Sequence, residues 1–97
     1  MEKKDAYEAR MQAQIDELKA DIAKMRARAE RATADARIKH HEVIEDLESR
    51  RLALERKVKE LREASSDALD TLRGGIDAAW SELKRSWDEA AKRLGGH

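Results

Sequence analysis

The residues from Leu61 to Leu94 decide the fold; they read LREASSDALDT, LRGGIDAAWSE, LKRSWDEAAKR and a final Leu. Leu61, Leu72, Leu83 and Leu94 recur at every eleventh position. Three further sets keep the same interval: Ala68, Ala79 and Ala90; Ser65, Ile76 and Trp87; and Leu69, Trp80 and Ala91. At about 100° per residue, these positions form an apolar stripe along one side of an α-helix. Such a stripe predicts a helix that packs against another apolar surface.

The composition of the 97 residues indicates the same class of structure. Charged residues make up 43% of the chain, Phe and Pro are absent, and only 4 residues are Gly. The alternating apolar and polar runs that predict β-strands do not occur. Ala, Leu, Glu, Lys, Arg and Asp dominate instead, which is typical of long helices and coiled coils. The sequence therefore predicts one all-α domain over residues 1–97, a long amphipathic helix that forms a coiled-coil bundle.

Upstream of the repeats, the apolar positions follow a heptad pattern. Residues 1–7 are mostly charged, and we expect them to fray. Alternate steps of four and three then join Met11, Ile15, Leu18, Ile22, Met25, Ala29, Ala32 and Ala36. After about residue 36 the spacing changes to hendecads, and the stripe runs through His40, Val43, Leu47, Arg51, Leu54, Val58 and Leu61. We expect a rod over residues 8–60 and eleven-residue repeats with paired Trp over residues 61–94.

Two places in the sequence favour a break in the rod. Ser65-Ser66-Asp67 resembles a helix N-cap, and Gly74-Gly75 is the only interior glycine pair. Each Gly costs about 1 kcal/mol relative to Ala in a helix, and a break there would produce a helical hairpin. However, the stripe passes both places without a change of phase. We therefore expect a continuous helix on the order of 140 Å long, ended by Gly95-Gly96.

A single rod buries little of its stripe, so it cannot offset the about 1–2 kcal/mol per residue that ordering costs. We therefore interpret the stripe as an interface between copies of the chain, in an oligomer from dimer to tetramer. Parallel and antiparallel arrangements both remain open. The residues assigned to this interface are Met11, Ile15, Leu18, Ile22, Met25, Ala29, Ala32, Ala36, Val43, Leu47, Leu54, Val58, Leu61, Leu72, Ile76, Trp80, Leu83, Trp87 and Leu94.

Two polar clusters are candidate sites, and both are better explained as structural or surface features. His40-His41 lies near Glu45, but zinc takes three or four ligands and the chain has no Cys. We interpret His40 as a polar interruption of the stripe, and we expect no metal and no cofactor. A basic block contains no aromatic residue on which bases would stack, so nucleic acid is not an expected partner; its members are Lys24, Arg26, Arg28, Arg31, Arg37 and Lys39.

Trp80 and Trp87 lie seven residues apart on the same side of the predicted helix. We interpret them as the widest layer of the bundle, because aromatic side chains bury the most area. The alternative is an amphipathic helix that lies on a lipid or storage-granule surface, as in phasin-like proteins. From Leu61 to Leu94 there are six basic and seven acidic residues, which disfavours anionic membranes and leaves neutral surfaces.

Two stretches resemble a group of short bacterial coiled-coil domain proteins to which no activity is assigned. These are MQAQIDELKADIAKMRARAERATADA at residues 11–36 and ALDTLRGGIDAAWSELKRSWDEAAKRL at residues 68–94. The likeness covers nearly the whole chain, and the paired Trp is its most recognisable part. The resemblance implies a bacterial, cytosolic, all-helical protein, and it implies no catalytic or ligand-binding residues.

These patterns lead to one expected function and one alternative. The segment MEKKDAYEARMQAQ has no apolar core of a secretion signal, and no run approaches the about 20 apolar residues of a membrane span. We therefore expect the cytoplasm. A thin rod offers no pocket for catalysis, so we expect no enzyme. The expected function is that of a structural or interaction protein that forms a homo-oligomer; the alternative is binding to a neutral lipid or granule surface.

Overall fold

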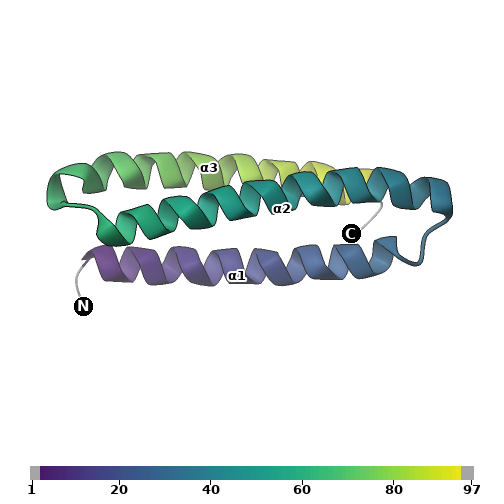
Figure 1. Cartoon of the computed structure of the whole chain (residues 1–97), viewed down its shortest axis with the longest axis horizontal. Coiled ribbons are helices and arrows are strands. Elements are labelled where there is room, and N and C mark those ends of the chain that lie inside the picture. The colour runs from purple at the N-terminus through teal and green to yellow at the C-terminus, as the bar shows by residue number, and fades with distance from the viewer. Residues whose placement is uncertain (1–2, 95–97) are drawn as a thin grey trace.

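The computed structural model describes residues 3–94, which form three long helices. They are α1 (Lys3–Ala29), α2 (Ala34–Glu63) and α3 (Ser66–Arg93). All three lie along a common long axis; α1 and α3 run in the same direction, and α2 runs in the opposite one (Figure 1). The chain measures 51 × 20 × 18 Å along its principal axes. The predicted all-α helical bundle is confirmed. The expectation of one continuous helix is wrong, because the chain reverses twice.

The first reversal, at residues 30–33, was not predicted. The end of α1 tightens, because the amides of Arg31 and Ala32 donate to carbonyls three residues earlier, at 3.1 Å each. Thr33 then begins α2 as its N-cap, and its hydroxyl oxygen accepts a hydrogen bond from the Ala36 amide at 3.4 Å. The apolar positions nearby are alanines, which bury too little area to hold a straight rod together. The expected rod over residues 8–60 is therefore two antiparallel helices.

The second reversal, at Ala64-Ser65, coincides with the cluster that resembles an N-cap. Both residues are extended, with φ and ψ of −75° and 147° at Ala64 and of −72° and 163° at Ser65. Ser65 holds the N-cap position of α3 without a side-chain hydrogen bond. The eleven-residue interval from Leu61 to Leu72 thus spans two helices. Leu61 of α2 and Leu72 of α3 nevertheless face the same core, one from each side of the turn.

The glycine pair does not break the chain. Gly74 and Gly75 lie inside α3, so the helix continues through them as expected, and the alternative of a hairpin break at this position is wrong. A methyl group added at either glycine would meet no atom within 4 Å. The pair is therefore a weak point of an otherwise regular helix, with room for larger residues.

The ends of the chain differ from expectation where the structure describes them. The predicted fraying of residues 1–7 is wrong for residues 3–7, because α1 begins at Lys3 and the Tyr7 side chain is only 4% exposed. α3 ends at Arg93, with Leu94 as its C-cap. The expected stop at Gly95-Gly96 falls outside the described residues.

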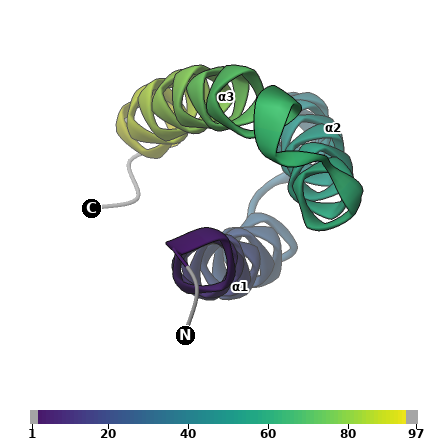
Figure 2. The same cartoon turned by 90° about the vertical axis from the view of Figure 1, so that its left-hand side faces the viewer.

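A single apolar core runs along the whole bundle. α1 buries Tyr7 and every heptad position from Met11 to Ala29. α2 buries Ile44, Leu47, Leu54, Val58 and Leu61, whereas α3 fully buries only Ile76, Leu83 and Ala90. An end-on view shows α2 beside both other helices, with α1 and α3 farther from each other (Figure 2). The wide apolar stripe of α3 is thus covered less completely than those of α1 and α2.

We predict that Gly74→Ala and Gly75→Ala each stabilise the protein by about 0.5–1 kcal/mol, because alanine lowers the entropy of the unfolded chain and its methyl group fits here. The measurement is the urea midpoint followed by circular dichroism. Ala78→Gly, at an exposed position of the same helix, is the control and should destabilise by a similar amount. A loss of stability in the two alanine variants would contradict a continuous α3.

Candidate functional site

Most residues that the sequence assigned to an interface between copies lie inside the single chain. The buried ones are Met11, Ile15, Leu18, Ile22, Met25, Ala29, Leu47, Leu54, Val58, Leu61, Ile76 and Leu83. The remaining ones are partly buried: Ala32, Ala36, Val43, Leu72, Trp80, Trp87 and Leu94. Only this second group retains apolar surface for another molecule. That it forms an interface between copies stays a prediction.

The side of the bundle between α1 and α3 is the least closed. α2 packs closely along both other helices, whereas α1 and α3 rarely approach each other. One end of this side is joined by Tyr7, whose hydroxyl donates to the Asp77 carboxylate at 2.6 Å. The Arg73 guanidinium lies 4.6 Å from the centre of the Tyr7 ring, which adds a cation–π contact. Beyond the contact of Tyr7 with Asp77 and Arg73, α1 and α3 leave space between them.

Two hollows lie in that space. The first has a volume of about 280 Å³ and is lined by Gln14, Glu17, Leu18, Asp21, Trp80 and Lys84. The second has a volume of about 200 Å³, and its lining includes Asp21, Lys24, Met25, Arg28, Trp87 and Leu94. Asp21 lines both, so the two hollows are neighbours along the helices. We call this surface the α1–α3 groove; α3 lines it with Trp80, Lys84, Trp87 and Leu94, and α1 lines it with a row of charged side chains.

The histidine pair does not form one site. His40 reaches the second hollow of the α1–α3 groove, and its Nδ1 is buried without a hydrogen-bond partner among the described residues. His41 lines a different hollow, of about 530 Å³, together with Arg26, Ile38 and others. Within residues 3–94, no group of three or more His, Cys, Asp or Glu side chains is arranged to hold a metal ion.

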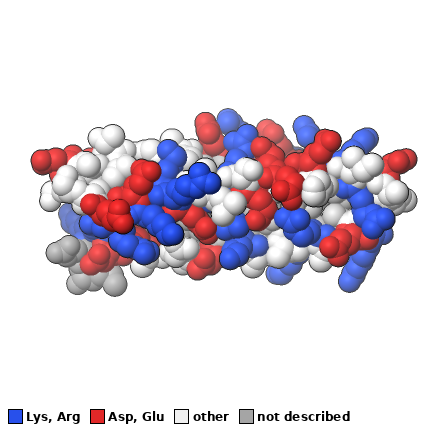
Figure 3. Space-filling view, viewed as in Figure 1, with Lys and Arg blue, Asp and Glu red and all other residues white. Residues whose placement is uncertain are grey.

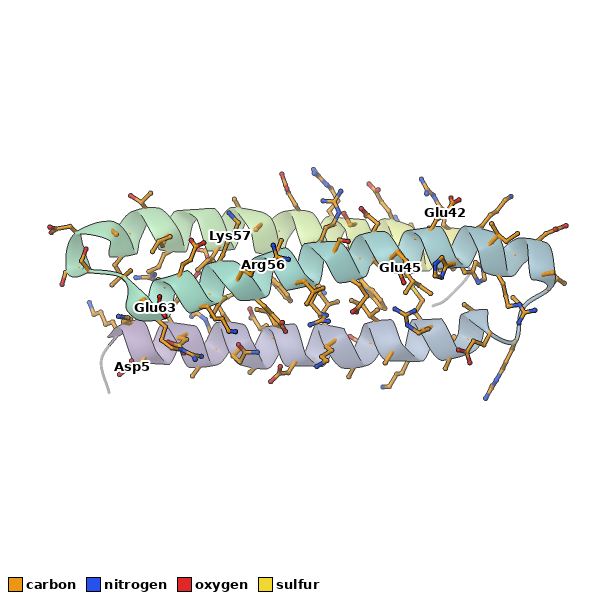
Figure 4. All side chains as sticks on the ribbon, in the orientation of Figure 1. Asp5, Glu42, Glu45, Arg56, Lys57 and Glu63 are labelled. Carbon is orange, nitrogen blue, oxygen red and sulfur yellow. The ribbon has the colours of Figure 1, made fainter. Side chains whose placement is uncertain are left out.

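The basic block of the sequence is divided among different surfaces. Lys24 and Arg28 border the α1–α3 groove, whereas Arg26 lies 3.5 Å from Glu45 of α2. Glu45 projects from the side of α2 that is nearer to α1 (Figure 4). On the face of the bundle over α2, positive and negative side chains are interspersed (Figure 3). Lys24 and Arg28 therefore lie on a different side of α1 from Arg26.

Arg51 is a buried charge at a stripe position of α2, only 6% exposed. Its Nη2 donates to Glu48 and its Nη1 to Glu55, each at 2.8 Å. The hydrogen bond from Arg51 lowers the pKa of Glu48 below its ordinary value of 4.5, while burial acts in the opposite direction. The sequence analysis placed Arg51 on the stripe without assigning it partners; Glu48 and Glu55, three and four residues away, lie within reach of it on the same helix. The cluster stabilises α2 and has no nucleophile.

The sequence reasoning missed Tyr7, which it placed in a frayed segment. Tyr7 lies four residues before Met11 and therefore on the same side of the helix, although alternate steps would place the next position at residue 8; the four-residue spacing could have identified it. Burial raises the pKa of the Tyr7 hydroxyl, and the hydrogen bond to Asp77 acts in the same direction. Tyr7 therefore stays neutral and fixes α3 against α1.

No helix among the described residues carries an apolar run that could cross a bilayer. Comparison with known proteins finds no family model, no curated protein and no solved structure that matches this chain.

We predict that Tyr7→Phe destabilises the protein by about 1 kcal/mol, because Asp77 loses its hydrogen bond while remaining solvated. Urea unfolding measures the effect. Asp77→Ala and the double variant complete a double-mutant cycle, in which the two single losses should not add. Additive losses would mean that Tyr7 and Asp77 do not interact.

We predict that protonation of Glu48 in acid lowers the stability of the protein. Because the folded state lowers the pKa of Glu48, this stabilisation is complete above pH 4.5 and is lost as the pH falls through the lower folded value. The urea midpoint of the wild type should therefore fall more steeply below pH 4.5 than that of Glu48→Gln. Glu60→Gln, at an exposed position of the same helix, should follow the wild type; equal slopes in all three would contradict the pairing with Arg51.

Proposed function

We propose that this protein is a non-enzymatic structural or interaction protein that acts by self-association. The proposal rests on one observation: Trp80, Trp87 and Leu94 lie partly exposed and close together along the α1–α3 groove. The associating unit is the folded three-helix chain rather than a long straight helix. Dimers to tetramers of such bundles replace the extended coiled coil expected from the sequence.

The energetics favour covering this surface. Each Å² of apolar area removed from water contributes about 25 cal/mol, and tryptophan has the largest side chain to cover. Tryptophan is also enriched among the residues that dominate binding energy at protein interfaces. The chain has 21 basic and 21 acidic residues, so no net charge repels one copy from another.

The proposal includes the bacterial cytosol as the place of action, which is what the resemblance to short bacterial coiled-coil proteins implies. It includes no catalytic step, since the polar residues that border the groove are charged, amide or imidazole side chains without a nucleophile beside a base. Contact with other proteins is the activity that such a surface supports.

A neutral lipid or granule surface is the competing partner for the same tryptophans. It is less favoured because α3 already turns its stripe inward, with Ile76 0% and Leu83 1% exposed. A helix lying flat on lipid would have to release these residues from the core. Lipid binding would therefore require the bundle to open, whereas self-association would not.

We predict that the wild type is an oligomer in sedimentation velocity at micromolar concentration, and that Trp80→Gln/Trp87→Gln is a monomer that keeps its helical circular dichroism. Trp80 lines one hollow of the groove and Trp87 lines the other, so the double variant removes an aromatic side chain from each. Ile38→Gln/Leu52→Gln is the matched control, because these side chains are 64% and 43% exposed outside the groove. The control should keep the wild-type mass.

A monomeric wild type at all concentrations would refute self-association. If that monomer gained helicity or changed its tryptophan emission on addition of neutral phosphatidylcholine vesicles, binding to a neutral surface would replace self-association as the function. A tryptophan double variant that kept the oligomer mass would show that the contact lies elsewhere on the bundle.

A further inference from the structure

The α1 edge of the groove carries four charges in two blocks. Glu17 and Asp21 are acidic, and Lys24 and Arg28, toward the end of the helix, are basic. Steps of four, three and four residues place all four on one side of α1. All four line the two hollows of the groove, which fixes that side as the one that borders α3.

These charges are available to another molecule. Glu17, Lys24 and Arg28 are exposed, and Asp21 is partly exposed. The ion pairs found within residues 3–94 join other side chains, such as Arg26 with Glu45 and Arg62 with Glu8. A row of available charges beside an apolar surface is the usual composition of an interface rim, where complementary charges set the register of two partners.

The order of the charges is complementary to itself when one copy of α1 runs antiparallel to another. Such a contact has a two-fold axis, and each contact on one side of the axis is repeated on the other. Asp21 then faces Lys24 of the second copy, and Glu17 faces Arg28. The midpoint of positions 21 and 24 and the midpoint of positions 17 and 28 both fall between Ile22 and Ala23. A single two-fold axis at this point therefore forms both pairs. With parallel copies of α1 side by side, like charges would face each other.

The same axis also brings apolar surface together. Trp87 lines one hollow with Asp21 and Lys24, so it lies at the level of the axis. In the antiparallel contact, α3 of one copy faces α3 of the other, and the two Trp87 side chains meet near the centre. The tryptophans and Leu94 then form an apolar centre, and the four charged pairs form its rim. A structureless lipid surface would make no use of this order of charges.

We therefore propose that a second copy of the chain occupies the α1–α3 groove as an antiparallel two-fold dimer, with Glu17 and Asp21 of each copy paired to Arg28 and Lys24 of the other. This inference rests on the proposed self-association and adds the surface, the symmetry and the residue pairs.

The test uses two full-length variants with opposite charge changes. Glu17→Lys/Asp21→Lys makes the row entirely basic, and Lys24→Glu/Arg28→Glu makes it entirely acidic. Each variant alone places like charges opposite each other and should self-associate on the order of 100-fold more weakly than the wild type. An equimolar mixture should form a heterodimer, because a basic row then faces an acidic one. Sedimentation velocity of each variant and of the mixture measures this.

Matched controls carry the same charge changes away from the groove. Glu42→Lys/Glu60→Lys and Arg56→Glu/Lys59→Glu alter exposed residues of α2. Arg56 lies on the face of the bundle that Figure 4 presents to the viewer, over α2 and away from the groove. Both controls should associate as the wild type does. A similar loss in the controls would mean that net charge, rather than the row on α1, governs association.

The outcomes separate this inference from the function on which it rests. A monomeric wild type refutes both. A wild-type oligomer whose groove variants keep their mass refutes the inference alone. Loss of mass in both variants without recovery on mixing also refutes it, because a parallel dimer would place α1 against α3. If circular dichroism shows a double variant to be unfolded, the exposed single variants Glu17→Lys and Arg28→Glu replace it, with the same expected recovery on mixing.

Discussion

The structure depends on mutual coverage: each helix has one apolar stripe, and the three stripes must cover one another along the whole bundle. α2 is the central element, since it packs against both α1 and α3. The stripe of α1 is narrow and is buried from Tyr7 to Ala29, whereas that of α3 is wide and carries two tryptophans. Packing within the bundle therefore covers the stripe of α1 but leaves one side of α3 partly uncovered, and this difference creates the α1–α3 groove.

Polar contacts select one arrangement among those that burial alone permits. Tyr7 joins α1 to α3 at one end through Asp77, and Arg62 bonds Glu8 across α1 and α2 at 2.6 Å. Arg51 takes a position that an apolar residue would otherwise fill, and its two carboxylate partners on α2 satisfy the buried charge. These contacts fix the register of the helices, while the apolar stripes supply most of the stability.

The groove connects this incomplete burial to function. Its tryptophans come from α3, whose apolar stripe is incompletely covered. Its row of charges comes from α1, whose apolar stripe is buried. Such a combination gives both a driving force and a means of choosing a partner, since apolar area is non-directional and charge order is directional. His40 lines one hollow of the groove from α2, and its buried Nδ1 has no hydrogen-bond partner within residues 3–94.

The sequence by itself determined the helical state and nearly all the positions that face a core, because composition and the 3.6-residue period act locally. It also indicated Ser65 as a possible helix start. Only the tertiary structure decided that the chain turns at residues 30–33 and 64–65 and continues through Gly74-Gly75. A short turn leaves the stripe in phase, so periodicity cannot distinguish one long helix from three. For the same reason, Leu83 reads as an interface residue but lies in the chain's own core: an apolar stripe is covered equally well by its own chain or by another.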